Sequence, residues 1–157
     1  MIEGTENIRD IFAIFHDGEI YKAELNNSAL TLFIRIRYLT QRINANFTYF
    51  MVNIYNITDV KFSTWESNPQ TLNKIDDIFA WNLDILESRA SESIIQVICN
   101  QTSPECNYCG GELSFCSNRC EVSDESGKLY SIDELDVICN EYWDKFASQN
   151  ISKTNNR

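Results

Sequence analysis

Four cysteines within fifteen residues form the densest group of reactive side chains in the sequence. Cys106 and Cys109 are separated by two residues and are followed by two glycines. Two thiolates at this spacing can bind one zinc ion, and glycine permits the tight turn that this requires. Cys116 and Cys120 would complete a set of four ligands. One interpretation of this segment is therefore a small zinc-stabilised domain.

The residues between the two cysteine pairs favour a different interpretation. Residues 112–117 have strand character, and an extended chain would place Cys116 and Cys120 ~13 Å apart, too far for one tetrahedral site. The thiols would then act as small buried apolar groups, as free cysteines commonly do. Cys99 and Cys139 fall in an expected strand and an expected helix, where we predict core positions. We therefore expect no cofactor and keep zinc as the alternative.

The sequence holds little of what an enzyme of a common type would need. The single histidine, His16, lies beside Asp17 in an expected turn, and a nucleophilic site of the serine or cysteine type would have to use it. The adjacent carboxylates at 76–77 and 124–125 do not face one another for acid–base work. Glycine-rich phosphate loops, nucleophile elbows and zinc-protease motifs are missing from the sequence. We predict a non-enzymatic protein, with an enzyme of unrecognised type as a second alternative.

The net charge of -10 comes almost entirely from one half of the chain. Residues 1–75 contain eight acidic and seven basic side chains, and residues 76–157 contain fifteen and six. This excess disfavours nucleic acids and anionic membranes as partners. It is either a solvated surface or an acidic face for a basic protein partner. The candidate partner-binding residues are the carboxylates near the C-terminal helix: Asp124, Glu125, Asp133, Asp136 and Glu141.

Length and composition predict one domain with its own core. The chain has 157 residues, of which 43% are hydrophobic, and we expect a single domain over 1–148 and a polar, frayed tail over 149–157. No apolar run approaches the ~20 residues of a membrane span. The acidic N-terminus does not resemble a signal peptide. We therefore expect a cytoplasmic protein with reduced thiols.

Strands are expected throughout the first 65 residues. Alternation with period 2 and β-branched or aromatic residues carry this prediction. Asp17-Gly18 is typical of a tight hairpin between the first two strands. The expected strands are residues 11–15, 20–25, 31–38, 47–57 and 59–65.

The second half mixes helices and strands. Leu72, Ile75 and Phe79 recur at helical spacing and predict a short helix over 71–80. A hairpin is expected from 83–88 and 93–99, turned at 90–92. Further strands are expected at 112–117 and 119–123.

The C-terminal helix has the clearest local signals. Ser131 and Glu134 form a capping box, in which each side chain accepts a hydrogen bond from a free backbone N–H group. An apolar stripe follows at Leu135, Ile138, Tyr142 and Phe146. The element order predicts an α+β fold: a mostly antiparallel, curled β-sheet with a short middle helix and a C-terminal amphipathic helix packed on it.

The layout is similar to that of uncharacterised small acidic bacterial proteins, some of which are immunity partners of polymorphic toxins. The segments that carry the resemblance are Phe15-His16-Asp17-Gly18, the strand ending at Trp65, Gly110-Gly111-Glu112-Leu113, Asp124-Glu125-Ser126-Gly127 and Tyr142-Trp143-Asp144. The resemblance implies a cytosolic, non-enzymatic protein that binds another protein, with no catalytic residue and no metal. The leading hypothesis is therefore a protein-binding module of the immunity-inhibitor kind that presents an acidic surface to a basic partner.

Overall fold

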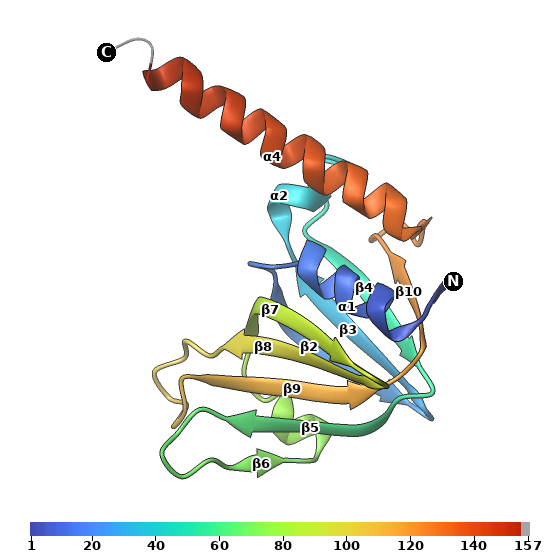
Figure 1. Cartoon of the computed structure of the whole chain (residues 1–157), viewed down its shortest axis with the longest axis vertical. Coiled ribbons are helices and arrows are strands. Elements are labelled where there is room, and N and C mark those ends of the chain that lie inside the picture. Colours follow the sequence, from blue (N-terminus) through green and yellow to red (C-terminus); the bar gives the residue numbers. More distant parts are fainter. Residues whose placement is uncertain (155–157) are drawn as a thin grey trace.

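The computed structural model describes residues 1–154 and contains one curled antiparallel sheet with four helices (Figure 1). The helices are α1 (Thr5–Ile14), α2 (Arg37–Thr40), α3 (Ile75–Ile78) and α4 (Ile132–Thr154). The strands are β1 (Ile2–Glu3), β2 (Glu19–Asn26), β3 (Ala29–Arg35), β4 (Tyr49–Tyr55), β5 (Thr58–Thr64), β6 (Thr71–Leu72), β7 (Leu83–Ser91), β8 (Ile94–Asn100), β9 (Gly110–Cys116), β10 (Arg119–Ser123) and β11 (Leu129–Tyr130). The α+β prediction is confirmed.

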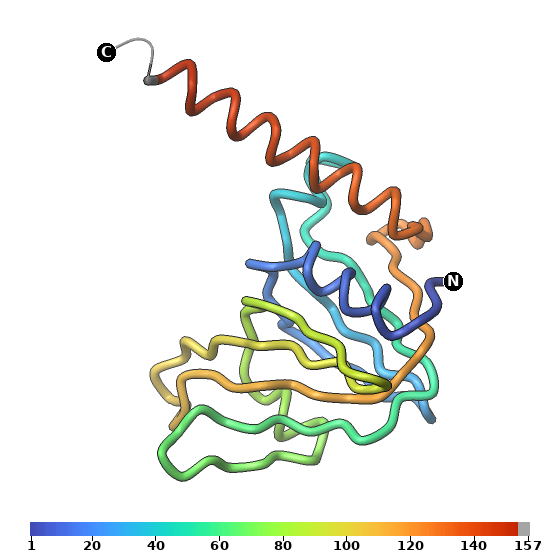
Figure 2. The backbone as a smooth tube through the Cα atoms, in the orientation of Figure 1, coloured from blue at the N-terminus to red at the C-terminus, as the bar shows by residue number. Residues whose placement is uncertain are grey.

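The sheet divides into two arms that meet at a narrow junction. Its strand order is β1-β10-β4-β3-β2-β7-β8-β9-β5-β6, and β11 pairs with β10. One arm comprises β1, β10, β4, β3 and β2, and the other comprises β7, β8, β9, β5 and β6. They meet where Glu19 and Ile20 of β2 pair with Asp84 and Leu83 of β7, and backbone hydrogen bonds between residues 17–18 and Ile85 extend this junction. The backbone trace shows the arms turning away from each other at this junction (Figure 2). The curl leaves a space between the arms that another element must fill.

Helix α1 fills that space, and the prediction of a strand at residues 11–15 is wrong. Ile8, Ile11, Phe12 and Phe15 are all fully buried, and they lie at the i, i+3, i+4, i+7 spacing of one helix face. Phe12 contacts Phe115 of β9 edge to face, with ring centroids 6.0 Å apart. Phe15 stacks on Phe50 of β4 at 5.0 Å. A five-residue apolar window cannot separate strand from buried helix, which explains the error.

The expected hairpin at Asp17-Gly18 is instead the turn from α1 into β2. Asp17 has a positive φ of 65°, and the Gly18 N–H group donates to the Phe15 carbonyl at 2.9 Å. An added Cβ at Gly18 would lie 2.8 Å from that carbonyl oxygen. The sequence therefore located the turn correctly, but the element before the turn is a helix and not a strand.

Two other expected elements are shorter than their patterns suggested. The strand expected at 31–38 ends at Arg35, because a short helix, α2, begins at Arg37 and its Thr40 hydroxyl donates to the Phe47 carbonyl. The helix expected over 71–80 is a two-residue strand, β6, followed by the single turn of α3. Leu72 pairs with Phe62 of β5 rather than continuing a helix face.

The remaining elements follow the predictions closely. β7 and β8 form the expected hairpin, turned at Glu92 with a φ of 55°. In the capping box of α4, the Ser131 N–H group donates to Glu134 at 2.8 Å and the Glu134 N–H group donates to the Ser131 hydroxyl at 3.1 Å. The helix continues to Thr154, past the expected boundary at residue 148.

Helix α4 packs on the body through its first half. Leu135 and Cys139 are buried, and Tyr142 contacts Tyr38 of α2 with ring centroids 4.5 Å apart. The second half extends beyond the sheet (Figure 1), and Ile151 is 64% exposed. Among residues 1–154, no helix is both long and apolar enough to cross a membrane.

Candidate functional site

A groove of about 580 Å³ lies between α1 and the first half of α4. Its walls combine carboxylates, aromatic rings and aliphatic groups. The lining residues are Asn7, Asp10, Ala13, Ile14, His16, Ile132, Asp133, Asp136, Cys139 and Trp143. None of these is Lys or Arg. Because α1 is held by the core between the two arms, the groove has one rigid wall.

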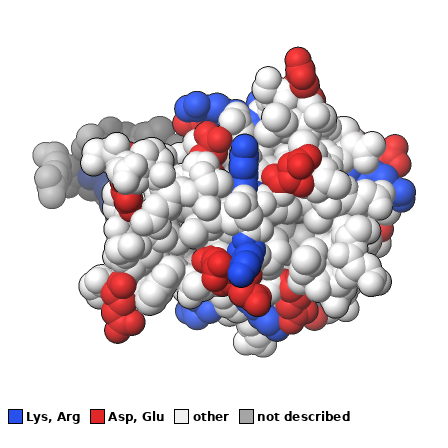
Figure 3. Space-filling model, turned by 90° about the horizontal axis from the view of Figure 1, so that it is seen from below, with Lys and Arg blue, Asp and Glu red and all other residues white. Residues whose placement is uncertain are grey.

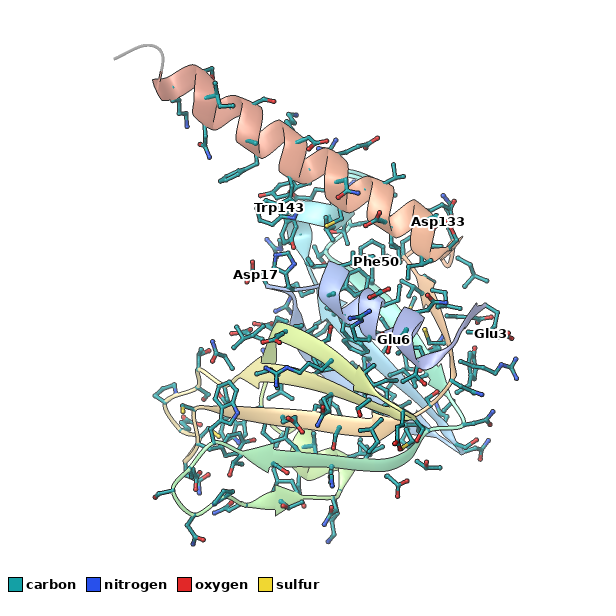
Figure 4. All side chains as sticks on the ribbon, viewed as in Figure 1. Glu3, Glu6, Asp17, Phe50, Asp133 and Trp143 are labelled. Atoms are coloured by element: carbon teal, nitrogen blue, oxygen red, sulfur yellow. The ribbon has the colours of Figure 1, made fainter. Side chains whose placement is uncertain are left out.

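The aromatic side of the groove is a stack of His16 and Trp143. Their ring centroids are 5.6 Å apart and their planes differ by 14°. The Tyr38 hydroxyl donates to the His16 carbonyl at 2.9 Å, and the Tyr38 ring meets Trp143 edge to face at 6.0 Å. Trp143 remains 37% exposed. Figure 4 shows it directed from α4 toward the body. This stack therefore offers a preformed aromatic surface.

The acidic part of the groove comes from both helices. Asp10 of α1 pairs with the Arg9 Nε atom at 2.7 Å. Asp133 and Asp136 are exposed on the first turns of α4, and Asp136 accepts a hydrogen bond from the Asn140 side-chain amide at 3.2 Å. Within residues 1–154, neither Asp133 nor Asp136 forms an ion pair. Two of the predicted carboxylates thus keep their charge available to a ligand.

Glu141, a third predicted residue, lies outside the lining of the groove. It is exposed on α4 and pairs with Arg42 at 3.7 Å, across the contact between α4 and the segment after α2. Exposed ion pairs of this kind are weak. Glu141 therefore remains accessible, but part of its charge is used within the chain.

Asp124 does not lie on the surface. Only 1% of it is exposed, and its carboxylate accepts hydrogen bonds from the Ser126 N–H and hydroxyl groups, the Lys128 N–H group and the Tyr130 hydroxyl. Burial raises the pKa of Asp124, but these four donors outweigh it and leave the pKa below its usual value. Asp124 therefore holds the turn between β10 and β11, and its prediction as a partner-facing residue does not fit this position.

Glu125 is also used within the fold. One carboxylate oxygen accepts hydrogen bonds from the Thr48 N–H and hydroxyl groups and from the Tyr49 N–H group. These contacts join the β10–β11 turn to the start of β4, more than 70 residues earlier in the chain. The predicted acidic surface therefore separates into two structural carboxylates and three accessible ones.

The structure does not bring the four candidate zinc ligands together. Cys109 precedes β9 and Cys116 ends it, so the two lie roughly 20 Å apart along an extended strand. Cys120 is fully buried in β10, opposite Ile54 of β4. Within residues 1–154, no group of three or more His, Cys, Asp or Glu side chains is placed to hold a metal ion.

The thiols that lie in the core are poor nucleophiles. Burial raises the pKa of Cys99 and of Cys120 to about 12, and it also raises the pKa of Cys139 in the wall of the groove. The thiolate is the reactive form of cysteine. Cys139 therefore contributes apolar surface to the groove rather than chemistry.

Sequence reasoning missed the contribution of α1 to this site. Asp10 and Ile14 lie on the helix α1, whereas the sequence predicted a strand over residues 11–15 and no helix before it. The available signal was the spacing of Ile8, Ile11 and Phe12, which predicts a helix when the window is extended toward the N-terminus. With α1 recognised, Asp10 would fall on the helix face opposite the core.

The groove therefore combines exposed carboxylates with aromatic and aliphatic surface. Comparison of the chain with protein-family models, with curated proteins and with solved structures gives no match.

Proposed function

We propose that this protein is a non-enzymatic binding module that receives a basic segment of a protein partner in the groove between α1 and α4. The observation that carries the proposal is that one groove contains two exposed carboxylates and an exposed aromatic ring. The carboxylates are Asp133 and Asp136, neither of which forms an ion pair within residues 1–154, and the ring is the half-exposed indole of Trp143. No Lys or Arg lines that groove.

Lysine and arginine match this combination of groups. Their aliphatic stems can lie against apolar surface while the charged head remains hydrated or paired. Ile14 and Ile132 supply such surface, and Trp143 offers a ring to a cation. Asp133 and Asp136 would then accept charge-assisted hydrogen bonds from the head group.

The charge distribution supports approach of a basic partner to this side. The lower face of the molecule carries interspersed Lys, Arg, Asp and Glu side chains with no uniform patch (Figure 3). Asp133, at the start of α4, lies in the upper part of the molecule, away from that lower face, and Glu6 of α1 lies near the middle (Figure 4). Complementary charge of this kind increases association rates and makes them depend on salt.

The resemblance to immunity proteins gives this proposal a specific form. An immunity-type inhibitor acts by covering a partner, so it needs a binding surface and no reaction. On this proposal the protein works in the cytoplasm, needs no cofactor, and uses Asp133 and Asp136, with Glu141 at the edge of the contact. Neither nucleic acid nor membrane is a partner.

The test uses an arginine hexapeptide as probe and tryptophan fluorescence as readout. We expect binding that changes the emission of Trp143 and weakens at least fivefold between 50 and 200 mM salt, in keeping with exposed charge pairs. The double variant Asp133→Asn, Asp136→Asn should bind about tenfold more weakly. The double variant Asp76→Asn, Asp77→Asn removes the same charge from α3, on exposed positions away from the groove, and is the matched control.

If both double variants bound the peptide equally weakly, the effect would come from net charge alone, and this would contradict binding in the groove. Binding that ignores salt would also contradict the proposal, because the carboxylates would then have no part in it. Replacing Trp143 by Phe should keep the binding but remove most of the fluorescence change.

A further inference from the structure

A second groove lies between α4 and the segment that contains α2 and the two residues after it, and we call it the α2–α4 groove. Its volume is about 570 Å³. Helix α2 lies against α4 at this position (Figure 1). Arg42 and Lys145 line the α2–α4 groove, and among the residues that the structure describes no Asp or Glu does. In a chain with a net charge of -10, this is a local reversal of charge.

The two cations lie beside the same turn of α4. The Arg42 guanidinium approaches the Glu141 carboxylate at 3.7 Å, and Lys145 follows Glu141 by four residues, on the same face of the helix. A separation of 3.7 Å is too long for a hydrogen bond, so the N–H donors of Arg42 remain largely unused. Within residues 1–154, Lys145 forms no ion pair. Positive charge is therefore concentrated here and little of it is neutralised.

The Arg42 side chain is positioned by the fold and does not move freely in solvent. Only 27% of it is exposed, and its backbone N–H group donates to the Leu39 carbonyl at 3.1 Å. An arginine that is already held in place loses less conformational entropy when it binds an anion. Arg42 is therefore a better anchor than a fully exposed cation.

A row of aromatic rings forms the apolar wall of the α2–α4 groove. The centroid of the Tyr142 ring lies 4.5 Å from that of Tyr38 and 6.3 Å from that of Phe146. The planes of Tyr142 and Phe146 differ by 22°, so these two rings are stacked. Phe146 ends the row and is 46% exposed. A further aromatic ring could therefore pack on Phe146.

Two amide side chains, those of Gln41 and Gln149, complete the lining. Each is exposed and offers a donor and an acceptor, as a peptide group does. The lining from Tyr142 to Gln149 covers ~10 Å of the helix axis, which is the length of about three residues of extended chain. The amides and the length of the groove therefore favour a peptide over a small anion.

We propose that the α2–α4 groove binds a short acidic segment of a protein, in which an aromatic residue stands next to Glu or Asp. Arg42 and Lys145 pair with the carboxylates of the segment through charge-assisted hydrogen bonds, and its aromatic ring packs on Phe146. A carboxylate of the segment replaces Glu141 beside Arg42. The charge preference is opposite to that of the groove between α1 and α4, so this inference does not depend on the proposed function.

NMR titration of backbone amides in the full chain tests the proposal, with the acetylated and amidated tripeptide Glu-Phe-Glu as probe. We expect the signals of residues 38–42 and 142–149 to shift. The neutral tripeptide Gln-Phe-Gln should bind about tenfold more weakly, because two charge pairs are lost. The tripeptide Glu-Ala-Glu should bind about fivefold more weakly, because it has no ring to pack on Phe146.

Variants of the chain locate the binding. The double variant Arg42→Gln, Lys145→Gln should bind Glu-Phe-Glu about tenfold more weakly. The double variant Lys74→Gln, Lys153→Gln removes the same charge from exposed positions outside the lining and is the matched control. We expect the control to bind within about twofold of the wild type, because separated surface charges are screened by salt.

Replacing Glu141 with Gln gives a change of opposite sign. Without the competing carboxylate, Arg42 is free for the probe, and Glu-Phe-Glu should bind about twofold more tightly. The arginine peptide that tests the groove between α1 and α4 should not bind more tightly to this variant, because Glu141 is an acidic residue at the edge of that contact. The two proposals can therefore fail separately.

Four results would overturn the proposal. Equal weakening in the two double variants would mean that net charge alone sets the affinity. Equal binding of Glu-Phe-Glu and Gln-Phe-Gln would exclude a role for the carboxylates. Weaker binding to Glu141→Gln would show that Glu141 does not compete for Arg42. Binding of phenylacetate as tight as that of the tripeptide would assign the α2–α4 groove to a small aromatic acid.

Discussion

Two pairs of carboxylates lie close together in the sequence but have different roles in the structure. Asp124 and Glu125 are buried or half-buried in the turn between β10 and β11, and their oxygens accept hydrogen bonds from that turn and from the start of β4. Asp133 and Asp136 follow on the first turns of α4, are exposed, and form no ion pair within residues 1–154. The same residue type is structural in one pair and available for binding in the other.

The local backbone decides the difference. A turn leaves N–H groups without partners, and a carboxylate beside it can accept several of them. In a helix, the N–H groups beyond the first turn already donate to carbonyls, so side chains on the outer face project into solvent. A count of acidic residues therefore overstates the binding surface wherever a turn contributes to it.

Replacing Asp124 with Asn should have the largest effect on stability. The change removes the charge from a carboxylate that accepts four hydrogen bonds and introduces an amide donor against the Tyr130 hydroxyl or the Ser126 N–H group. We expect a loss of about 3 kcal/mol, because hydrogen bonds to a buried charged group are the costly ones to lose. Urea denaturation at pH 7 measures it. A loss below about 1 kcal/mol would show that the turn does not depend on this carboxylate.

The pH dependence gives the same carboxylate a second test. Its pKa in the folded protein lies below its usual value, through hydrogen bonds that outweigh burial. Its contribution to stability is therefore complete above about pH 3.9, the unfolded value, and is lost as the pH falls through the lower folded value. Stability of the wild type should fall more steeply than that of Asp124→Asn below about pH 4. Parallel curves would contradict the assignment.

Replacing Glu125 with Gln should have the next largest effect. The substitution keeps one acceptor oxygen but removes the charge that holds the Thr48 and Tyr49 N–H groups. We expect a loss of about 1.5 kcal/mol in urea denaturation. Because Glu125 and Asp124 lie in one turn, the double variant should lose less than the sum of the two. Strict additivity would show that the two carboxylates act independently.

Local signals predicted the strand pairs and the last helix, because those elements are decided by nearby residues. The capping box of Ser131 and Glu134, the β7–β8 hairpin and the alternation in β3 are all short-range patterns. Helix α1 was missed because its apolar face can be recognised only when Ile8 is included with Ile11 and Phe12. Its burial between two arms of the sheet is a long-range property that no window contains.

The candidate site was predictable only in part, for the same reason. Asp133 and Asp136 were identified from charge and position on α4. Their groove needs α1 as the second wall, and the burial of Asp124 depends on donors that the folded turn brings to it.

Replacing Ser131 with Ala tests the boundary between the two carboxylate pairs. The hydroxyl accepts from the Glu134 N–H group at the start of α4, and losing an N-cap of this kind costs about 1 kcal/mol. Ser131→Thr retains the hydroxyl and should lose less than half as much. If both variants were as stable as the wild type, the packing of α4 on α1 and α2 would position Asp133 and Asp136 without the cap.

Replacing Asp133 and Asp136 with Asn should change stability least, because neither carboxylate forms an ion pair within residues 1–154. The remaining contribution is the interaction of Asp133 with the helix dipole at the start of α4, about 0.5 kcal/mol, since Asp136 lies beyond the first turn. Urea denaturation should therefore show a loss of only about 0.5 kcal/mol for the double variant at low salt, and less at 0.5 M salt. A loss as large as that of Asp124→Asn would mean that these carboxylates also belong to the fold. A small loss together with weaker peptide binding would separate the two pairs completely, because charge that contributes little to folding would then contribute to recognition.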